Sequence, residues 1–191
     1  MREFLERAQA AVGDDGRLVP GSMASWDVFP FETAGLRVRS LEEYAVPEPD
    51  RTRTPESCGT CRALVTDDLL LHTGERLGVV RPSGCNLVFV ANVVSRSHES
   101  LDDLDDEGHA EMGRLIGRTY RAMKSLEGVG NVHVNKWENG GGHLSVTLLA
   151  RPEGVLQLRG SNLTVWADML PATPREELDA RAELVRAALA R

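Results

Sequence analysis

Two cysteines and two histidines offer the strongest chemistry in this chain. Cys58 and Cys61 are separated by two residues, His98 follows an apolar run over 86–94, and His143 opens a run of alternating polar and apolar residues. Two thiolates and two imidazoles make a tetrahedral zinc set in which the thiolate charges cancel the charge of the metal. We therefore expect Zn²⁺ to be held by these four side chains.

A strand, a glycine turn and a second strand are predicted over residues 131–152. Because side chains alternate between the faces of a strand, His143, Ser145 and Thr147 are expected on one face, and the apolar residues between them on the other. One face is then core and the other is a candidate site. An ordinary antiparallel strand with one face in water would show the same alternation.

The order of these features resembles the histidine-triad (HIT) superfamily. The order is CxxC, a histidine after an apolar strand, an acidic helix start and a strand of the form H-φ-x-φ-x-φφ-x-R, over residues 58–152, about half of the chain. That superfamily also contains galactose-1-phosphate uridylyltransferase and the dinucleoside polyphosphate phosphorylases. In its zinc-bearing members the two cysteines, the strand-closing histidine and the first triad histidine hold the metal. The resemblance therefore implies the same zinc site here, and also a homodimer.

The chain departs from the triad at its two later positions. In the relatives the second triad histidine attacks the α-phosphate and the third completes the triad, whereas Ser145 and Thr147 stand at these positions here. Asn135 resembles the asparagine that helps to hold the nucleotide phosphate in these relatives. Gly141 and Gly142 leave backbone N–H groups open, as an anion-cradling loop requires, although a plain flexible turn would look alike.

His133 is expected to share a face with Asn135, one strand away from the second strand. It is a candidate base that would activate Ser145 or a water molecule, provided that a hydrogen bond is within reach. His109 is expected to be a solvated helix residue, and Cys85 is expected to be a small buried residue rather than a reactive thiol.

These residues support three hypotheses about function. The first is a zinc-binding relative of the HIT proteins that binds a nucleotide or another phosphorylated small molecule, with covalent nucleotidyl chemistry lost or much reduced. This follows because a phosphoramidate intermediate needs an imidazole where Ser145 stands. The second is a working nucleotide hydrolase or nucleotidyltransferase with a non-standard base or nucleophile. The third is a structural or interaction protein with a vestigial pocket.

The elements that must position the site predict an α+β fold: an antiparallel sheet of the HIT kind, one long central helix, a zinc knuckle and terminal helices. The organisation expected is one compact domain, with an N-terminal part over 1–57, the zinc-binding core over 58–152 and a C-terminal part over 153–191. Period-two and helical patterns predict the following elements: helix 2–12, strands 25–32 and 36–41, linker 44–55, strands 68–73, 75–80 and 86–94, a helix from 100 to 128, two short strands in 155–171, and a helix that starts from a capping box at 173–176.

The composition of the chain limits the classes of partner that we expect it to bind. The chain has 22 basic and 29 acidic residues, a net charge of −7, and 41% hydrophobic residues. This balance argues against nucleic acid, which draws on clustered Lys and Arg. No apolar run is long enough to span a bilayer, and the N-terminus is unlike a secretory signal. With three cysteines, two of them in a CxxC, a reducing cytoplasmic location is expected.

Overall fold

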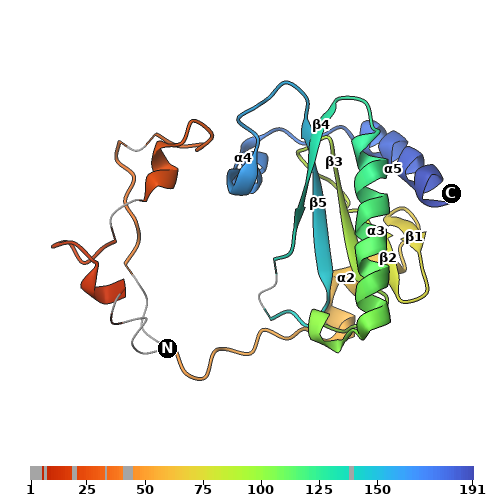
Figure 1. Cartoon of the computed structure of the whole chain (residues 1–191), viewed down its shortest axis with the longest axis horizontal. Helices are drawn as coiled ribbons and strands as arrows, with labels where there is room; N and C mark the ends of the chain where they lie inside the picture. The colour runs from red at the N-terminus through yellow and green to blue at the C-terminus, as the bar shows by residue number, and fades with distance from the viewer. Residues whose placement is uncertain (1–5, 7, 19–20, 33, 41–44, 138–139) are drawn as a thin grey trace. The chain divides into compact units, whose positions relative to one another are not determined.

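The computed structural model describes residues 6, 8–18, 21–32, 34–40, 45–137 and 140–191 (Figure 1). The chain forms two compact units, Met1–Asp50 and Arg51–Arg191. The boundary between them lies within the segment expected to be a linker.

The first unit contains little regular structure among its described residues. Residues 6 and 8–10 are helical, while 2–5 and 7 of the expected helix lie outside the described residues. A 3₁₀ helix, η1, covers Ser22–Ser25. The strands expected over 25–32 and 36–41 do not form in the described part of these ranges. Pro30 has no N–H to donate to a ladder, and the Phe29 N–H bonds the Trp26 carbonyl in a turn.

The second unit contains a five-stranded antiparallel sheet in the order β1-β2-β3-β5-β4. The strands predicted over 68–73, 75–80 and 86–94 and the strand pair predicted in 131–152 are confirmed, with ends shifted by a few residues. The expected α+β class is confirmed as well. The strands are β1 (Leu70–Thr73), β2 (Leu77–Val80), β3 (Phe89–Ser95), β4 (Val129–Asn135) and β5 (Ser145–Pro152).

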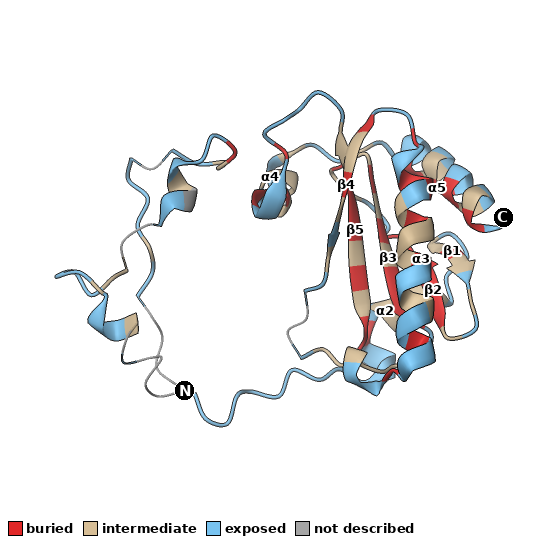
Figure 2. Ribbon diagram, in the orientation of Figure 1, coloured by how far each residue is buried: buried red, intermediate tan, exposed pale blue. Residues whose placement is uncertain are grey.

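The central helix α3 (Asp106–Lys124) packs along the sheet, with α5 (Arg175–Leu189) beside it (Figure 1). Asp105 caps α3 by accepting a hydrogen bond from the Gly108 N–H, which satisfies one of the free donors at a helix start. Ahead of it, a 3₁₀ helix, η3, covers Leu101–Asp103, so the predicted helix is interrupted near its beginning. Figure 2 shows that the middle of β3 and β5 is largely buried.

The core between the sheet and the two helices is apolar and contiguous. It buries the sheet-facing sides of α3 and α5 against alternate residues of the strands, as their periodicity requires. Its most buried large side chains are Phe89, Leu77, Met123, Leu144, Leu148, Leu189, Val79, Val93 and Val185.

The two strands predicted in 155–171 are wrong. The segment forms a 3₁₀ helix, η4 (Gly160–Asn162), followed by the helix α4 (Leu163–Met169). Leu163, Trp166 and Leu170 recur at helical spacing and pack on Leu149 and Val90. A helical stripe that covers the second face of the sheet therefore overrides the local alternation.

The capping box predicted for α5 does not form either. Pro174 occupies the N-cap position, and no side chain there bonds the helix start. The Thr173 hydroxyl donates instead to the Leu87 carbonyl at 2.7 Å, and the Thr173 N–H donates to the Cys85 carbonyl. Thr173 thus ties the start of the helix to the loop before β3.

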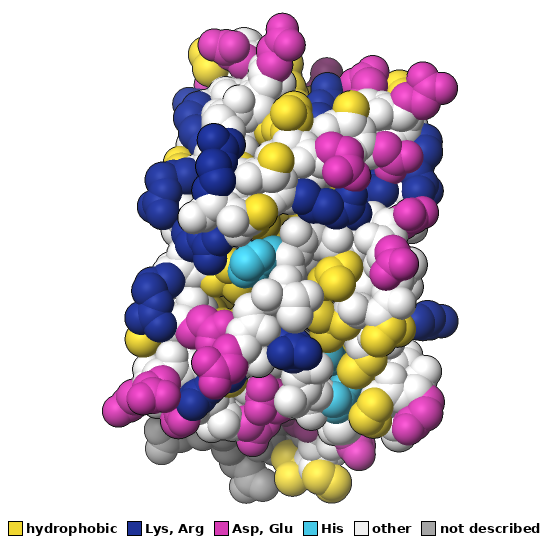
Figure 3. All heavy atoms as spheres, turned by 90° about the vertical axis from the view of Figure 1, so that its right-hand side faces the viewer, with side chains coloured by type: hydrophobic (Ala, Val, Ile, Leu, Met, Phe, Trp, Pro, Cys, Tyr) yellow, Lys and Arg dark blue, Asp and Glu magenta, His cyan; other side chains and the backbone are white. Residues whose placement is uncertain are grey.

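None of the described helices is long and apolar enough to cross a membrane. The face shown in Figure 3 carries basic, acidic and apolar side chains side by side.

Candidate metal centre

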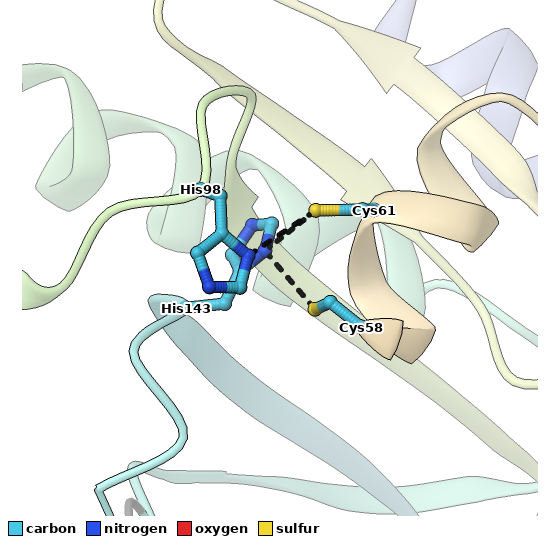
Figure 4. A group of neighbouring side chains, drawn as sticks. All are labelled: Cys58, Cys61, His98 and His143. Atoms are coloured by element: carbon cyan, nitrogen blue, oxygen red, sulfur yellow. Dashed lines mark hydrogen bonds between the residues drawn. The ribbon is translucent and has the colours of Figure 1, made fainter. Parts of the chain in front are cut away.

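Three segments far apart in the sequence deliver the two cysteines and two histidines to one place (Figure 4). Cys58 lies between the 3₁₀ helix η2 (Pro55–Ser57) and the short helix α2 (Gly59–Leu64), and Cys61 lies within α2. A spacing of three residues puts both sulfurs on one side of this turn. His98 lies in the loop after β3, and His143 lies just before β5.

The ligand atoms of the four side chains lie within 4.8 Å of one another. The Nδ1 atom of His143 is 3.4 Å from the Cys58 sulfur and 3.3 Å from the Cys61 sulfur, and the Nδ1 atom of His98 is 3.3 Å from the Cys61 sulfur. Tetrahedral Zn²⁺ with ordinary bond lengths separates its sulfur and nitrogen ligands by about 3.5 Å. The four donors therefore form a two-cysteine, two-histidine metal site.

The His143 ring is oriented by the protein. Its Nε2 atom lies 2.8 Å from the carbonyl oxygen of Ser95, a fully buried residue at the end of β3. Because a carbonyl can only accept, Nε2 carries the proton and Nδ1 keeps its lone pair, which points toward the cysteines. A second hydrogen bond of this kind is what fixes the tautomer of metal-binding histidines. The His98 ring stands edge-on to it, with ring centroids 5.0 Å apart.

The protonation of the ligands suits a metal. Burial lowers the pKa of His143 and so favours its neutral, ligating form. Burial raises the pKa of the Cys58 thiol, but hydrogen bonds from the Cys61 and Thr60 backbone outweigh it, and this pKa falls below its ordinary value. Burial and the neighbouring Cys58 raise the pKa of Cys61. The shift at Cys58 favours the thiolate that binds a metal, whereas the shift at Cys61 favours the thiol, which must lose its proton when a metal binds.

The polar residues predicted on β5 are half-buried on the face away from α3. Along the strand, Ser145 and Thr147 alternate with Val146 and Leu148, which are buried on the opposite face in the core. The Thr147 hydroxyl donates to the side-chain oxygen of Asn92 at 2.7 Å. Asn92 was not predicted, although it is a polar residue in the middle of the apolar run that forms β3.

The β4–β5 register separates the two predicted catalytic residues. Asn135 pairs with Thr147, but His133 pairs with Leu149, four residues along β5 from Ser145. At about 3.3 Å per residue this is roughly 13 Å, so the structure does not bring His133 into hydrogen-bond reach of Ser145. Burial, and then the charge of Arg151, lower the pKa of His133 and keep it neutral.

The glycine turn approaches the metal centre closely. Gly140 and Gly142 have φ values of 76° and 73°, a left-handed conformation that favours glycine. A Cβ atom on Gly142 would lie 3.3 Å from the Thr52 side chain and 3.5 Å from the His98 Nε2 atom. Residues 138 and 139 of this turn lie outside the described residues.

A cavity of about 550 Å³ opens beside the metal ligands and the turn. Four of its lining residues were not predicted, because nothing local in the sequence links them to the glycine turn: Arg51, Arg53, Gly59 and Thr60. The cavity is lined by Arg51, Arg53, Cys58, Gly59, Thr60, Gly141 and His143.

Comparison with protein families and with curated proteins finds no match for this sequence. Solved structures do match. A zinc-bound histidine triad family protein from Mycobacterium smegmatis is 18% identical, with a TM-score of 0.51, over 72% of this chain and 96% of that chain. A histidine triad protein from Bradyrhizobium japonicum is 21% identical, with a TM-score of 0.53, over 63% of this chain and 90% of that chain.

A uridylyltransferase mutant is 19% identical, with a TM-score of 0.51, and the match covers 71% of this chain and 48% of that chain. At these identities the matches establish the fold. The molecule is therefore an α+β protein with the fold of the histidine triad proteins, as the sequence predicted, and it carries a candidate two-cysteine, two-histidine metal site.

Proposed function

We propose that this protein is a zinc-binding HIT-fold protein that binds a nucleotide or a related phosphorylated small molecule, and that covalent nucleotidyl transfer is lost or much reduced. Zinc is favoured because two thiolates and two imidazoles neutralise it in tetrahedral geometry. The uridylyltransferase of the same fold supports a nucleotide as the ligand class. The observation that carries the proposal is Ser145, two residues after the metal ligand His143.

A hydroxyl at this position needs a base, and each of the two neighbouring imidazoles directs its Nδ1 atom toward the cysteines. His143 uses Nδ1 toward the cysteines and Nε2 toward the Ser95 carbonyl, and the His98 Nδ1 atom faces Cys61. His133 lies four residues along the strand. With Nδ1 of both His98 and His143 committed to a metal, no nearby imidazole of the described residues is left to act as the activating base that a serine nucleophile requires. The glycine turn and the face of β5 that carries Ser145 and Thr147 could still bind a ligand, because binding does not require a nucleophile.

The test is incubation of the metal-loaded protein with adenylyl and uridylyl substrates, followed by intact-mass and product analysis. We expect nucleotides to raise the melting temperature without a covalent adduct or product. A nucleotidyl adduct on the protein would contradict the proposal. Turnover without an adduct would favour a hydrolase in which neutral His133 activates water, and failure of every nucleotide to shift the melting temperature would favour an interaction protein.

Ser145→His tests the same idea from the other side, because it restores an imidazole at the attacking position. We expect this variant to gain measurable hydrolysis or a covalent adduct, while Ser145→Asn, a polar replacement without a nucleophile, remains inactive. Inactivity of a folded, metal-loaded Ser145→His protein that still binds nucleotide would show that more than the nucleophile is missing.

A further inference from the structure

Two cavities of the second unit contain pairs of arginines, and they differ in how these arginines are engaged. One cavity, of about 580 Å³, contains Arg76 and Arg96. The guanidinium of Arg76 is held by Asp105 and Glu107, and that of Arg96 donates to the carbonyls of Gly74 and Glu75. These cations already have partners within the protein. The arginines of the cavity beside the metal centre, Arg51 and Arg53, form no such ion pair with the described residues.

We propose that Arg51, Arg53 and Thr60 form an anion-binding pocket that takes the pyrophosphate or phosphate group of the ligand. The pocket lies against the metal ligand His143 and the Gly141 backbone, which line the same cavity. This inference rests on the proposed function for the nature of the ligand. It adds which end of the ligand is bound, where, and by which side chains.

The arginine segment is attached to the glycine turn. The Arg53 N–H donates to the Gly141 carbonyl at 3.3 Å, and the Thr52 side chain fills the space beside Gly142, where a Cβ would be 3.3 Å away. Segment 51–53, the glycine turn and the knuckle around Cys58 thus form one continuous wall. The arginines are held at the mouth of the site by backbone contacts, and their guanidinium groups remain available.

The charge of the pocket favours an anion. Among the described residues, its lining contains two guanidinium cations and no carboxylate. Both lining arginines are exposed, and neither forms an ion pair with any residue in the described part of the chain. The two thiolates of the adjoining centre are neutralised when a divalent metal is bound, so the arginines set the local charge. The whole chain carries −7, which makes this local excess of positive charge more distinctive.

The chemistry of arginine points to phosphate. A planar guanidinium donates two parallel hydrogen bonds to phosphate oxygens, and the Thr60 hydroxyl adds a neutral donor. A volume of about 550 Å³ falls within the range of small-molecule sites. Two forks and a hydroxyl suit a group with several anionic oxygens, as in pyrophosphate or a nucleoside diphosphate, better than a single carboxylate.

The experiment is isothermal titration calorimetry of the full-length, metal-loaded protein with inorganic pyrophosphate and, separately, with ADP and UDP. Arg51→Gln and Arg53→Gln should each weaken pyrophosphate binding about tenfold, and the double variant should weaken it about a hundredfold, since each removes a charge-assisted contact. Arg53→Lys keeps the charge without the fork and should fall between wild type and Arg53→Gln. The matched control, Arg114→Gln with Arg121→Gln, removes the same charge from exposed positions of α3 and should bind like wild type.

The outcomes separate this inference from the proposed function. Nucleotide binding that the double variant leaves intact would overturn the pocket while the proposed function stands. Pyrophosphate binding that is lost in the double variant, together with failure of ADP and UDP to bind any better, would support the pocket and overturn the nucleotide. Equal weakening by the control pair would overturn the pocket, because it would show a general charge effect. Absence of binding of all three probes to wild type would overturn both. Metal content and the melting temperature of each variant verify that it is folded.

Discussion

The metal centre and the Arg81 cluster both join segments that are far apart in the chain, but only the Arg81 cluster supplies its own cation. The Arg81 cluster consists of Arg81, Asp68, Asp179 and Arg175. Buried Arg81, which follows β2, bonds the Asp179 carboxylate of α5 at 2.5 Å and the Asp68 carbonyl at 3.0 Å. Arg175 of α5 bridges the two carboxylates.

This difference shows which contacts require an ion from the surrounding solution and which are formed by the chain alone. In the Arg81 cluster, arginine N–H groups donate to carboxylate and carbonyl oxygens of the same chain. These contacts attach α5 to the sheet without any added ion. At the metal centre, lone pairs of nitrogen and sulfur converge on one point, with N–S distances of 3.3–3.4 Å. Such a set is complete only with a cation. The metal centre should therefore depend directly on metal availability, whereas the Arg81 cluster needs no added cation to complete its contacts.

Removing the metal should have the largest effect. A structural zinc site contributes roughly 10 kcal/mol, comparable with the net stability of a whole domain. Chelation, or Cys58→Ser with Cys61→Ser, should abolish or greatly lower the cooperative melting transition measured by circular dichroism, with metal content measured alongside. Cys85→Ser is the control, because this cysteine is outside the ligand set, and it should retain a full complement of metal. An unchanged melting temperature in a metal-free protein would refute the structural role.

Asp179→Ala should have the next largest effect, because it leaves the buried Arg81 guanidinium without its carboxylate. Breaking one side of a buried pair is costly, although half-exposed Asp179 moderates the loss. We expect the melting temperature to fall by roughly 5 °C with metal content unchanged. As a comparison, Glu177→Ala removes an exposed ion pair to Arg181 on the same helix. It should lower the melting temperature by about 1 °C at most. Loss of metal in Asp179→Ala would mean that the two clusters are coupled.

Thr147→Val should lower the melting temperature by a smaller amount, and it measures the contribution of a hydrogen bond between two neutral side chains. The variant keeps the shape of the side chain but removes the hydrogen bond to Asn92, which is worth about 1 kcal/mol. The melting temperature should fall by about 3 °C, measured with the metal bound. Thr147→Ser retains the hydroxyl and should recover part of this loss. Equal melting temperatures for Val and wild type would show that the bond contributes nothing to stability.

His133→Gln should have the smallest effect on the melting temperature. It tests how much of the acid sensitivity comes from His133 and how much from the metal centre. Burial, then Arg151, lower the pKa of His133 below its ordinary value of 6.5. Below that value the unfolded chain binds the proton more readily than the folded one, so stability falls as the pH drops from about 6.5 toward the folded pKa. His133→Gln should therefore lose slightly less of its melting temperature between pH 7 and pH 5.5 than wild type does.

The acid loss that remains in His133→Gln would then belong largely to the metal centre, where protons compete with the cation for His143, His98 and the thiolates. Metal release measured over the same pH range should follow this remaining loss. If His133→Gln instead removed the whole acid response, the metal centre would not be the acid-sensitive element.

The sequence by itself determined the donor set, the five strands of the sheet and the central helix. Residue types and short spacings carry these signals: two thiols three positions apart, an apolar run ending near His98, and a helical stripe with acidic residues at its start. Such patterns arise from periodicity and ligand chemistry, which act locally or through side chains that only a metal would bring together.

Only the tertiary structure decided the rest. Register fixes that His133 faces Leu149 and not Ser145, and no local pattern encodes which residues of two strands become partners. Packing against Leu149 and Val90 makes α4 a helix where alternation had predicted strands. The Arg53–Gly141 contact spans more than eighty residues, and the site acquires its cations through it. Contacts at such separations depend on how the whole chain closes on its core, and this cannot be inferred from any one segment.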